Sequence, residues 1–350
     1  MTDATTHAKT ATPVRLGLIG SGWIGAFHAE TIAQRIPSAE LAVVADPVPG
    51  AAERVAAPLG VSKTVLDAAE VFADPDVDGV VISSPAFTHA GLVVAAAEAG
   101  KAVFVEKPMA LTLEDADRAI LAAKNAGVPL QTGFNRRFSR DFASAHQIVA
   151  DGGIGTPQLL RSLTRDPGIP NPGAVKPWTI FLETLIHDFD TLNWFNADAR
   201  PVEVFAVADA LAYPDFKQSG LLDTAMVTIR YSNGALASAE ANFSAAYGYD
   251  VRGEVFGSGG MVTAGDVRAT STRHYSGAGA AAPTTRLNID LFHQAYTDEL
   301  VSFVDAIRNG GPVAGATGAD ARAALVIALA CIESVTRGAP VALDDRGAVI

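Results

Sequence analysis

Short apolar segments alternate with helix-period segments over the first third of the chain. The apolar segments are Arg15–Ile19, Leu41–Ala45, Val77–Ile82, Ala102–Val105 and Pro129–Gln131. Ala-rich stretches with the period of an amphipathic helix, such as Ile24–Arg35 and Ala90–Gly100, separate them. Strands that are apolar on both faces and joined by helices form parallel sheets covered on each side. The pattern therefore predicts a doubly wound α/β domain.

The pattern changes after Gly133. A helical stretch, Arg140–Ala150, comes first. Alternating strands follow, separated by glycine turn signals at Gly152-Gly153, Asn233-Gly234 and Gly257–Gly260, and a long helical region closes the chain. Because strands and helices are segregated here, we expect an α+β domain on a large, mostly antiparallel or mixed sheet. A chain of 350 residues also suits two domains, since single cores stop growing near ~250–300 residues. We therefore divide it into residues 1–133 and 134–350.

Composition and charge exclude several classes of protein. Hydrophobic residues make up 49% and charged residues 18%, which is typical of a folded chain. The net charge of −12 argues against a nucleic-acid partner, because nucleic-acid binders usually present a basic surface. We expect Arg136 and Arg137, just after the domain boundary, to pair with this acidic surface; the alternative is that they reach the crevice between the domains. The single cysteine, Cys331, excludes an intramolecular disulfide and any metal site built from several cysteines. We expect a buried, unreactive thiol there and no metal site.

Two segments bear on the location of the protein. Met1–Pro13 is polar and lacks the apolar stretch of a secretory signal, so we expect a frayed tail on a cytoplasmic protein. Gly79–Ala97 contains no Asp, Glu, Lys or Arg over almost the length of a membrane span. Ser83-Ser84-Pro85 and His89 interrupt this segment. A strand, a turn and an Ala-rich helix explain it better, so we expect no membrane span.

The first apolar segment runs into the sequence Gly20-Ser21-Gly22-Trp23-Ile24-Gly25, which fits G-x-G-x-x-G at a strand-to-helix turn. In this pattern Gly20 permits the tight turn, Gly22 lets the backbone approach a pyrophosphate, and Gly25 lets the helix pack on the strand. Unpaired N–H groups at the start of the helix would face the phosphate oxygens. The motif predicts a dinucleotide site of the Rossmann type. A purely structural turn is the alternative.

Asp46 ends the second apolar segment, ~20 residues after Gly25. A carboxylate at this place accepts hydrogen bonds from the adenosine ribose hydroxyls. It would repel a ribose phosphate, and no Arg or Lys follows at Pro47, Val48 or Pro49, so the sequence favours NAD over NADP. The alternative is an Asp-Pro turn that merely ends the strand.

The chain resembles the Gfo/Idh/MocA oxidoreductases from about Val14 to its end, because five motifs occur in the order found in that family. They are Gly20-Ser-Gly-Trp-Ile-Gly25, Ser83-Ser-Pro85 with His89, Glu106-Lys107-Pro108, Gly133-Phe-Asn-Arg-Arg-Phe138 and Ile186-His-Asp-Phe-Asp190. Within the family, Thr184-Leu-Ile-His187 and Tyr247-Gly-Tyr-Asp250 are most similar to the inositol dehydrogenases.

The resemblance implies a Rossmann domain and a second domain whose large sheet supports substrate and subunit contacts. It further implies an NAD-dependent dehydrogenase that oxidises a secondary ring hydroxyl of a cyclic polyol or sugar to a ketone or lactone, in a homodimer or homotetramer. Beyond the glycine motif and Asp46, the implied cofactor contacts are Ser83, Ser84, Pro85, His89, Glu106 and Lys107. The alternatives are that Ser83 and Ser84 merely end the strand in a turn and that His89 is a solvated side chain.

Three residues are candidates for the chemistry, since oxidising an alcohol needs a base for its proton and positive charge near its oxygen. His187 suits the first task, because imidazole titrates near working pH. If Ile180–Trp194 is helical, Glu183 shares a face with His187 and can orient the ring; a surface ion pair is the alternative. Lys107 follows a strand whose carboxyl end faces the ligand crevice, and Glu106 is its expected counter-ion. A surface Glu-Lys pair is the alternative there, and the resemblance places Lys107 and His187 in the catalytic group.

Two candidate substrate contacts depart from residues common in inositol dehydrogenases. Many members have Asp where this chain has Glu183, and Asp166 matches an Asn that contacts substrate, while Thr164 replaces a His. Such changes alter which polyol is bound, because an unmet buried polar group costs about 1–3 kcal/mol. The reaction type therefore transfers better than the exact substrate.

Three aromatic residues are further candidates for substrate contact. Tyr247 and Tyr249, two apart on an expected strand, would point to one face and offer rings and hydroxyls to a sugar. Trp178 lies in a Pro/Gly-rich loop and would cover the crevice as a lid. Core packing or loop anchoring is the alternative for each.

Two other functions would keep the cofactor. Some members of the family cleave glycosidic bonds through transient oxidation and elimination, and one is a repressor that binds dinucleotide without turnover. A glycoside-cleaving enzyme would form product without accumulating NADH, whereas a sensor would bind NAD without turning over any polyol. The presence of Lys107 and His187 favours an enzyme over a sensor.

Overall fold

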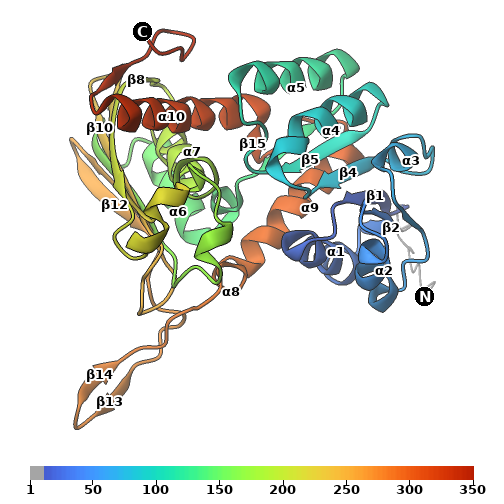
Figure 1. The fold of residues 1–350 in the computed structure, drawn as a ribbon, viewed down its shortest axis with the longest axis horizontal. Helices are drawn as coiled ribbons and strands as arrows, with labels where there is room; N and C mark the ends of the chain where they lie inside the picture. Colours follow the sequence, from blue (N-terminus) through green and yellow to red (C-terminus); the bar gives the residue numbers. More distant parts are fainter. Residues whose placement is uncertain (1–11) are drawn as a thin grey trace, which may run out of the picture.

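The computed structural model describes residues 12–350, so most of the polar start Met1–Pro13 lies outside the described residues. Within this range the chain forms two seven-stranded sheets, here called A and B, and a separate two-stranded hairpin. Figure 1 shows sheet B and its helices beside sheet A, with the hairpin β13–β14 standing away from both.

Sheet A confirms the predicted doubly wound domain. Its strand order is β3-β2-β1-β4-β5-β6-β15; the first six strands are parallel, and β15 pairs antiparallel with β6. The order reverses between β1 and β4, where such sheets bind ligands at the carboxyl ends of their strands. The strands are β1 Val14–Ile19, β2 Ala39–Ala45, β3 Thr64–Val65, β4 Gly79–Ile82, β5 Ala102–Glu106, β6 Leu130–Gly133 and β15 Ala316–Thr317.

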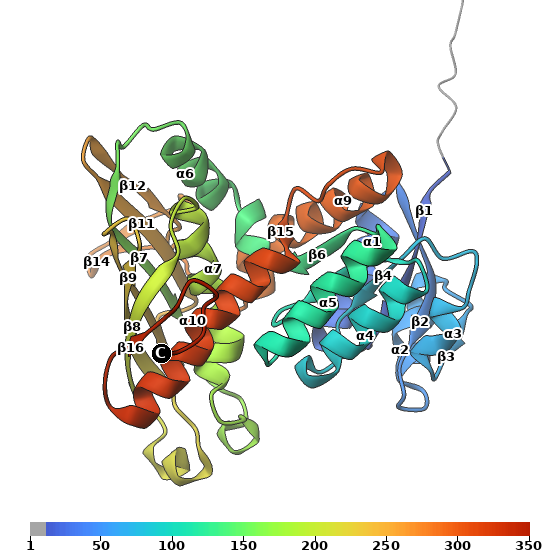
Figure 2. The same cartoon turned by 90° about the horizontal axis from the view of Figure 1, so that it is seen from above.

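Helices cover both faces of sheet A, because its central strands are apolar on both sides. Helices α4 (Ala86–Glu98) and α5 (Leu113–Ala126), with the short α3 (Ala68–Phe72), pack on one face. Helices α1 (Trp23–Arg35), α2 (Ala51–Ala56) and α9 (His293–Asn309) pack on the other. Figure 1 shows sheet A between α4 and α5 on one side and α1 and α2 on the other, and Figure 2 shows α4 and α5 in front of the sheet. The charge-free segment Gly79–Ala97 forms β4, a turn and most of α4. No helix within residues 12–350 is long and apolar enough to cross a membrane.

Sheet B confirms the mixed sheet predicted for the second domain. Its order is β12-β11-β7-β10-β9-β8-β16, in which β7 and β10 are parallel and the other neighbours are antiparallel. The strands are β7 Pro157–Arg165, β8 Pro201–Asp209, β9 Thr224–Tyr231, β10 Leu236–Asn242, β11 Asp250–Gly257, β12 Gly260–Ala264 and β16 Val341–Ala342.

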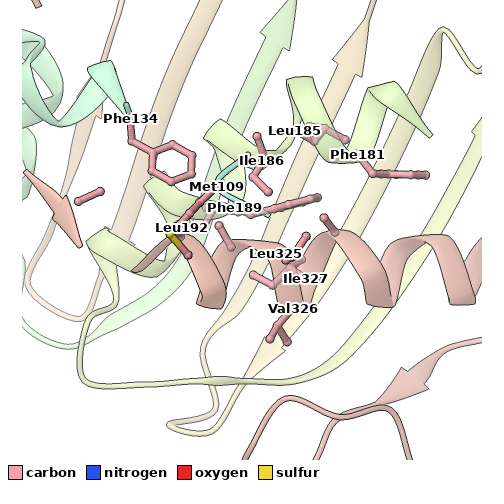
Figure 3. Packing of buried hydrophobic residues seen from close by; sticks show 14 of the residues in the cluster. Met109, Phe134, Phe181, Leu185, Ile186, Phe189, Leu192, Leu325, Val326 and Ile327 are labelled. Atoms are coloured by element: carbon pink, nitrogen blue, oxygen red, sulfur yellow. The ribbon is translucent and has the colours of Figure 1, made fainter. Parts of the chain in front are cut away.

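Helices α6 (Arg140–Ala150), α7 (Ile186–Phe195) and α10 (Gly318–Arg337) cover one face of sheet B. Figure 3 shows Phe189 and Leu192 of α7 close to Leu325 and Ile327 of α10, all within one buried cluster. Cys331 of α10 is fully buried in the same cluster, as expected. The alternation of buried and exposed side chains along the strands of sheet B therefore arises because helices cover one face of the sheet and leave the other face open.

Helix α9 and strand β15 return from the second half of the chain to sheet A. Leu300 and Phe303 of α9 pack in one cluster with Leu16 and Phe104 of sheet A. The chain then crosses back through α10, which contacts α5 beside sheet A and α7 and β8 of the second domain. The remaining elements are η1 Ala57–Leu59, η2 Asn135–Phe138, η3 Pro172–Ala174, η4 Ile180–Thr184, η5 Pro214–Ser219, α8 Asn288–Leu291, β13 His274–Ser276 and β14 Gly279–Ala281.

Candidate active site

A cavity of about 700 Å³ lies at the carboxyl ends of β4 and β5, where the two domains meet. Its volume is in the range of small-molecule and cofactor sites. The structure brings most of the predicted site residues to its lining: Trp23, Ile24, Ser83, Ser84, Pro85, His89, Glu106, Lys107, Asp166, Glu183, His187 and Tyr249.

The glycine motif forms the turn from β1 into α1 beside this cavity. Gly20 has φ +92°, and a Cβ there would lie 2.7 Å from the backbone nitrogen of Ser84. A Cβ on Gly25 would lie 2.1 Å from the carbonyl oxygen of Gly20, so the helix approaches the turn only with glycine. A Cβ on Gly22 would meet nothing within 4 Å, and no side chain caps the start of α1. The open side at Gly22 and the free N–H groups fit a pyrophosphate.

Asp46 follows β2 and is tied to the glycine turn. Its Oδ2 accepts hydrogen bonds from the backbone N–H of Ser21 at 2.8 Å and from the Ser21 hydroxyl at 2.7 Å, and its Oδ1 accepts from the N–H of Val48 at 2.9 Å. Burial raises the pKa of Asp46, but these hydrogen bonds outweigh it and lower the pKa overall. The group is therefore a carboxylate beside the cofactor turn. The contact with Ser21 had no signal in the sequence pattern.

Ser83 and His89 hold the ends of neighbouring strands together. The Ser83 hydroxyl donates to the carbonyl oxygen of Gly20 at 2.9 Å. The two ring nitrogens of His89 lie 2.8 Å from the carbonyl oxygen of Pro108 and 2.7 Å from that of Ser84. Because His89 is buried, the alternative of a solvated histidine is wrong. These contacts make the strand ends a fixed wall of the cavity.

Lys107 lies directly after β5 and spans the two domains. Its ammonium donates to the backbone carbonyl oxygen of Glu183 at 2.9 Å. The expectation that Glu106 is its counter-ion is wrong, because Glu106 Oε1 instead lies 2.7 Å from Nε2 of the buried His28. His28 sits on α1, far away in sequence, which is why the strand motif alone gave no indication of it.

His187 lies near the start of α7, after the wide turn η4. The expected helix Ile180–Trp194 is interrupted there, because the N–H of Leu185 donates to the carbonyl of Ile180, five residues earlier, at 2.8 Å. This widening changes the four-residue relation of Glu183 to His187. Among residues 12–350 no hydrogen bond or ion pair joins them, and Nδ1 of His187 is buried without a partner. The structure thus brings the expected dyad to one cavity without joining it.

The imidazole of His187 is held in its neutral form. Burial lowers its pKa well below the usual value, and the nearby cations Lys107 and Arg136 lower it further. The ring also packs edge-on against Phe134, with centroids 5.7 Å apart. A neutral ring in this position can accept a proton.

Arg136 belongs to a buried polar network behind His187 that sequence reasoning did not identify. Its guanidinium donates to Asp188 Oδ1 at 2.8 Å and to the Thr164 hydroxyl at 2.5 Å. Ser162 and Thr164 also donate to the Asp188 carboxylate, at 2.5 and 2.7 Å. Arg136 and Asp188 both lie in family motifs, so the motifs themselves were the available signal. The expectation that Arg136 pairs with the acidic surface is wrong, because Arg136 is buried and lines the cavity, which is the alternative given above.

Asp166 and Tyr249 form the side of the cavity opposite sheet A. The Tyr249 hydroxyl lies near the Asp166 carboxyl group and lowers its pKa, while Asp166 Oδ1 is buried without a partner among the described residues. Burial raises the pKa of Asp166 to about 6, although Tyr249, Lys107 and Arg136 each lower it. A carboxylate oxygen with no protein donor suits a donor carried by a ligand.

Tyr247 and Trp178 are not brought to the cavity lining. The prediction that Tyr247 and Tyr249 lie on a strand and share one face is wrong: both precede β11 in a turn, with Gly248 at φ +127° between them. Tyr247 is exposed and donates to Asp250 Oδ2 at 2.8 Å. Trp178 has φ +67° and packs against the buried cluster near Phe181, which is the expected alternative of a loop anchor.

Comparisons with known proteins agree with this geometry. Residues 14–134 match the model of the oxidoreductase family with an NAD-binding Rossmann fold, and residues 142–263 match the GFO/IDH/MocA C-terminal domain. The chain is 36% identical to scyllo-inositol 2-dehydrogenase (NAD(+)) of Bacillus subtilis, over 96% of this chain and 98% of that protein. It is 37% identical to myo-inositol 2-dehydrogenase of Thermotoga maritima, over 95% and 99%.

A solved structure is similar over almost the whole chain. The crystal structure of scyllo-inositol dehydrogenase from Lactobacillus casei, with bound cofactor NAD(H) and scyllo-inositol, superposes with a TM-score of 0.90 at 30% identity. The superposition covers 95% of this chain and 99% of that one. The matched domains, the relatives and the cavity at the switch point lead to one conclusion: this chain belongs to the Gfo/Idh/MocA family of oxidoreductases.

Proposed function

We propose that this protein is an NAD-dependent dehydrogenase that oxidises a ring hydroxyl of a cyclic polyol. The observation that carries the proposal is that the neutral imidazole of His187 and the ammonium of Lys107 line one cavity beside the glycine turn. The relatives named for NAD and for scyllo- or myo-inositol support the cofactor and the class of substrate.

The proposed cofactor contacts lie on sheet A and α1. The α1 N-terminus receives the pyrophosphate at Gly22, and Asp46 accepts hydrogen bonds from the adenosine ribose hydroxyls. When bound, NAD supplies a hydride acceptor for the carbon that bears the substrate hydroxyl. A second negative charge on the ribose would meet the Asp46 carboxylate, so NADP is disfavoured.

The proposed chemistry belongs to three side chains. His187 takes the proton of the hydroxyl, because its low pKa keeps the ring neutral and able to accept. Lys107 stabilises the negative charge that develops on the substrate oxygen. Glu183, whose carboxylate is exposed at the cavity, stabilises the imidazolium once the proton has arrived. Asp166 and Tyr249 hold other hydroxyls of the ring, with Asp166 Oδ1 as an acceptor.

A direct test follows NADH absorbance with purified protein across inositols, pyranoses and their keto or lactone forms, with NAD and NADP in parallel. The expected result is NAD reduction with at least one cyclic polyol. Product formed without net NADH would instead support the glycoside-cleaving alternative. Tight NAD binding with no turnover on any polyol would support the sensor.

We also propose that the protein is a homodimer or homotetramer that associates through the open face of sheet B. Met261, Phe256, Leu159 and Leu236 are register partners across four neighbouring strands, so their side chains form one row. They are 56, 43, 53 and 43% exposed. A contiguous apolar row of this kind is typical of a subunit interface. Light scattering after size-exclusion chromatography measures the mass of the wild type and of Phe256→Asp. A wild type that is monomeric, or an oligomer that Phe256→Asp leaves intact, would contradict the proposal.

A further inference from the structure

Three buried ionisable side chains meet behind Lys107. His28 comes from α1, Glu106 from the end of β5 and Glu299 from α9, and each offers an atom within 4.8 Å of the other two. His28 and Glu299 are 0% exposed and Glu106 is 6% exposed. The cluster is therefore almost wholly removed from water, and only Glu106 of the three reaches the cavity lining.

Glu106 is fixed on both of its carboxylate oxygens. Its Oε1 lies 2.7 Å from Nε2 of His28, and since an ionised carboxylate only accepts, the ring nitrogen donates. Its Oε2 accepts from the backbone N–H of Lys107 at 3.2 Å. The orientation of Glu106 thus bears directly on the backbone that carries the Lys107 ammonium.

Glu299 contrasts with Glu106 in having no partner for its carboxyl group. Both of its oxygens are buried without a hydrogen bond among residues 12–350, although Gln131 Nε2 donates to its backbone carbonyl at 2.7 Å. An isolated buried carboxylate is far more costly than a buried neutral acid, and two carboxylates this close cannot both stay charged cheaply. The neutral acid is the form that this environment favours.

The electrostatics of the two glutamates agree with this division. Burial and the Glu106 carboxylate hold the pKa of Glu299 well above its usual value. Burial also raises the pKa of Glu106, but the hydrogen bond from His28 and the charges of His28, Lys107 and His89 lower it overall. The other titratable group facing the cluster is Tyr296, whose pKa is raised by burial and by both glutamates.

We propose that Glu299 is a neutral acid that shares its proton with the Glu106 carboxylate and so acts, with His28, as a positioning residue for Lys107. The proton reaches a free lone pair of Glu106 directly after a small side-chain shift or through one water molecule, since the atoms lie within 4.8 Å. The cluster then holds Glu106 by donors on two sides and fixes the Lys107 turn. The link to catalysis rests on the function proposed above.

Infrared spectroscopy of the full-length protein tests the protonation independently of catalysis. The carbonyl stretch of a protonated carboxylic acid is expected in the wild type at neutral pH, shifted in deuterium oxide and absent from Glu299→Gln. Absence of that band from the wild type would overturn the proposal. A stoichiometric divalent metal that keeps Glu299 ionised after purification would also overturn it.

Kinetics test the positioning. Glu299→Gln keeps a neutral donor, so kcat is expected to stay within about twofold; Glu299→Leu removes the donor and is expected to lower kcat about ten- to hundredfold, the scale of a ~1 Å misplacement. The NAD dissociation constant should change little in either variant. Val304→Ala, a buried change on the same helix away from the cluster, controls for lost packing and should keep kcat and the infrared band. Wild-type kcat in Glu299→Leu, or equal losses in the Gln and Leu variants, would overturn the positioning.

The two tests separate this inference from the proposed function. If no polyol is oxidised by the wild type, the proposed function fails while the infrared result still decides the state of Glu299. If turnover is present and the acid band is absent, the inference fails and the function stands.

Discussion

Replacing Asp166 with Asn probes the electrostatic cost that the cavity imposes on the substrate-free protein. Burial raises the pKa of Asp166 from 3.8 to about 6. Raising a pKa by one corresponds to ~1.4 kcal/mol, so ionising this buried group costs up to about 3 kcal/mol of folding free energy. Asn has nearly the same shape and carries no charge, so the variant escapes that cost.

The sign of the effect follows from proton linkage. Between about pH 4 and pH 6 the folded state binds more protons at Asp166 than the unfolded state, so wild-type stability falls as pH rises through this window. Above about pH 6 Asp166 is ionised in both states, so the loss of stability is complete and no longer changes with pH. Asp166→Asn should therefore be more stable than the wild type at pH 7.5, by up to about 3 kcal/mol, and the advantage should shrink toward pH 4.

Denaturant unfolding of both proteins without ligand, at several pH values from 4.5 to 7.5, measures this difference. An unmet N–H of the new Asn would shift every value equally, so the change of the difference with pH is the informative quantity. A difference that does not vary with pH would refute the reasoning. The same variant should lose about ten- to hundredfold in kcat/KM for the polyol, because a hydrogen bond to a charged group contributes ~1.5–3 kcal/mol.

Three further substitutions test the proposed roles. His187→Ala should lose most of kcat while keeping the NAD dissociation constant, since the ring is proposed to move a proton and not to hold the cofactor; unchanged kcat would remove it from the mechanism. Asp46→Ala should weaken NAD binding at least tenfold, by ~1.4 kcal/mol or more, with little change in the polyol KM, because it loses the ribose acceptor and the tether to Ser21; equal NAD affinity in titration would contradict this. Glu183→Gln should lower kcat more than it changes polyol KM, because the site loses the negative charge proposed to stabilise the imidazolium, and a steady-state profile with only KM altered would assign Glu183 to binding instead.

The architecture was predictable wherever strands are long and apolar. The five predicted segments of sheet A correspond to β1, β2, β4, β5 and β6. Strands β3 and β15 have two residues each and are too short to produce a periodic pattern. The wide turn η4 was not predictable, since the spacing of Phe181, Leu185 and Phe189 is also that of a regular helix. One extra residue in a turn leaves the apolar pattern almost unchanged while moving polar side chains relative to each other.

The site was predictable as a set of residues but not as a set of contacts. Motif order identified Lys107 and His187, and the match to a substrate-contacting Asn identified Asp166; all three line the cavity. The partners of these groups lie far away in the chain: Glu106 is bonded by His28 of α1 and faces Glu299 of α9. Such pairings depend on how the helices cross the sheet, and the spacing of residues within one segment carries no information about that. The raised pKa of Asp166 likewise arises from burial, which becomes visible only in the folded chain.

Helix α9 and strand β15 have a consequence for anyone who recombines members of this family. Cutting the chain after Gly133 would separate Leu16 and Phe104 from the α9 side chains that cover them, and would leave one edge of β6 unpaired. A chimera that exchanges cofactor specificity should therefore carry the segment from His293 to Thr317 along with the N-terminal domain. Junctions placed on either side of that segment keep the hydrophobic face of each sheet together with the helices that pack on it.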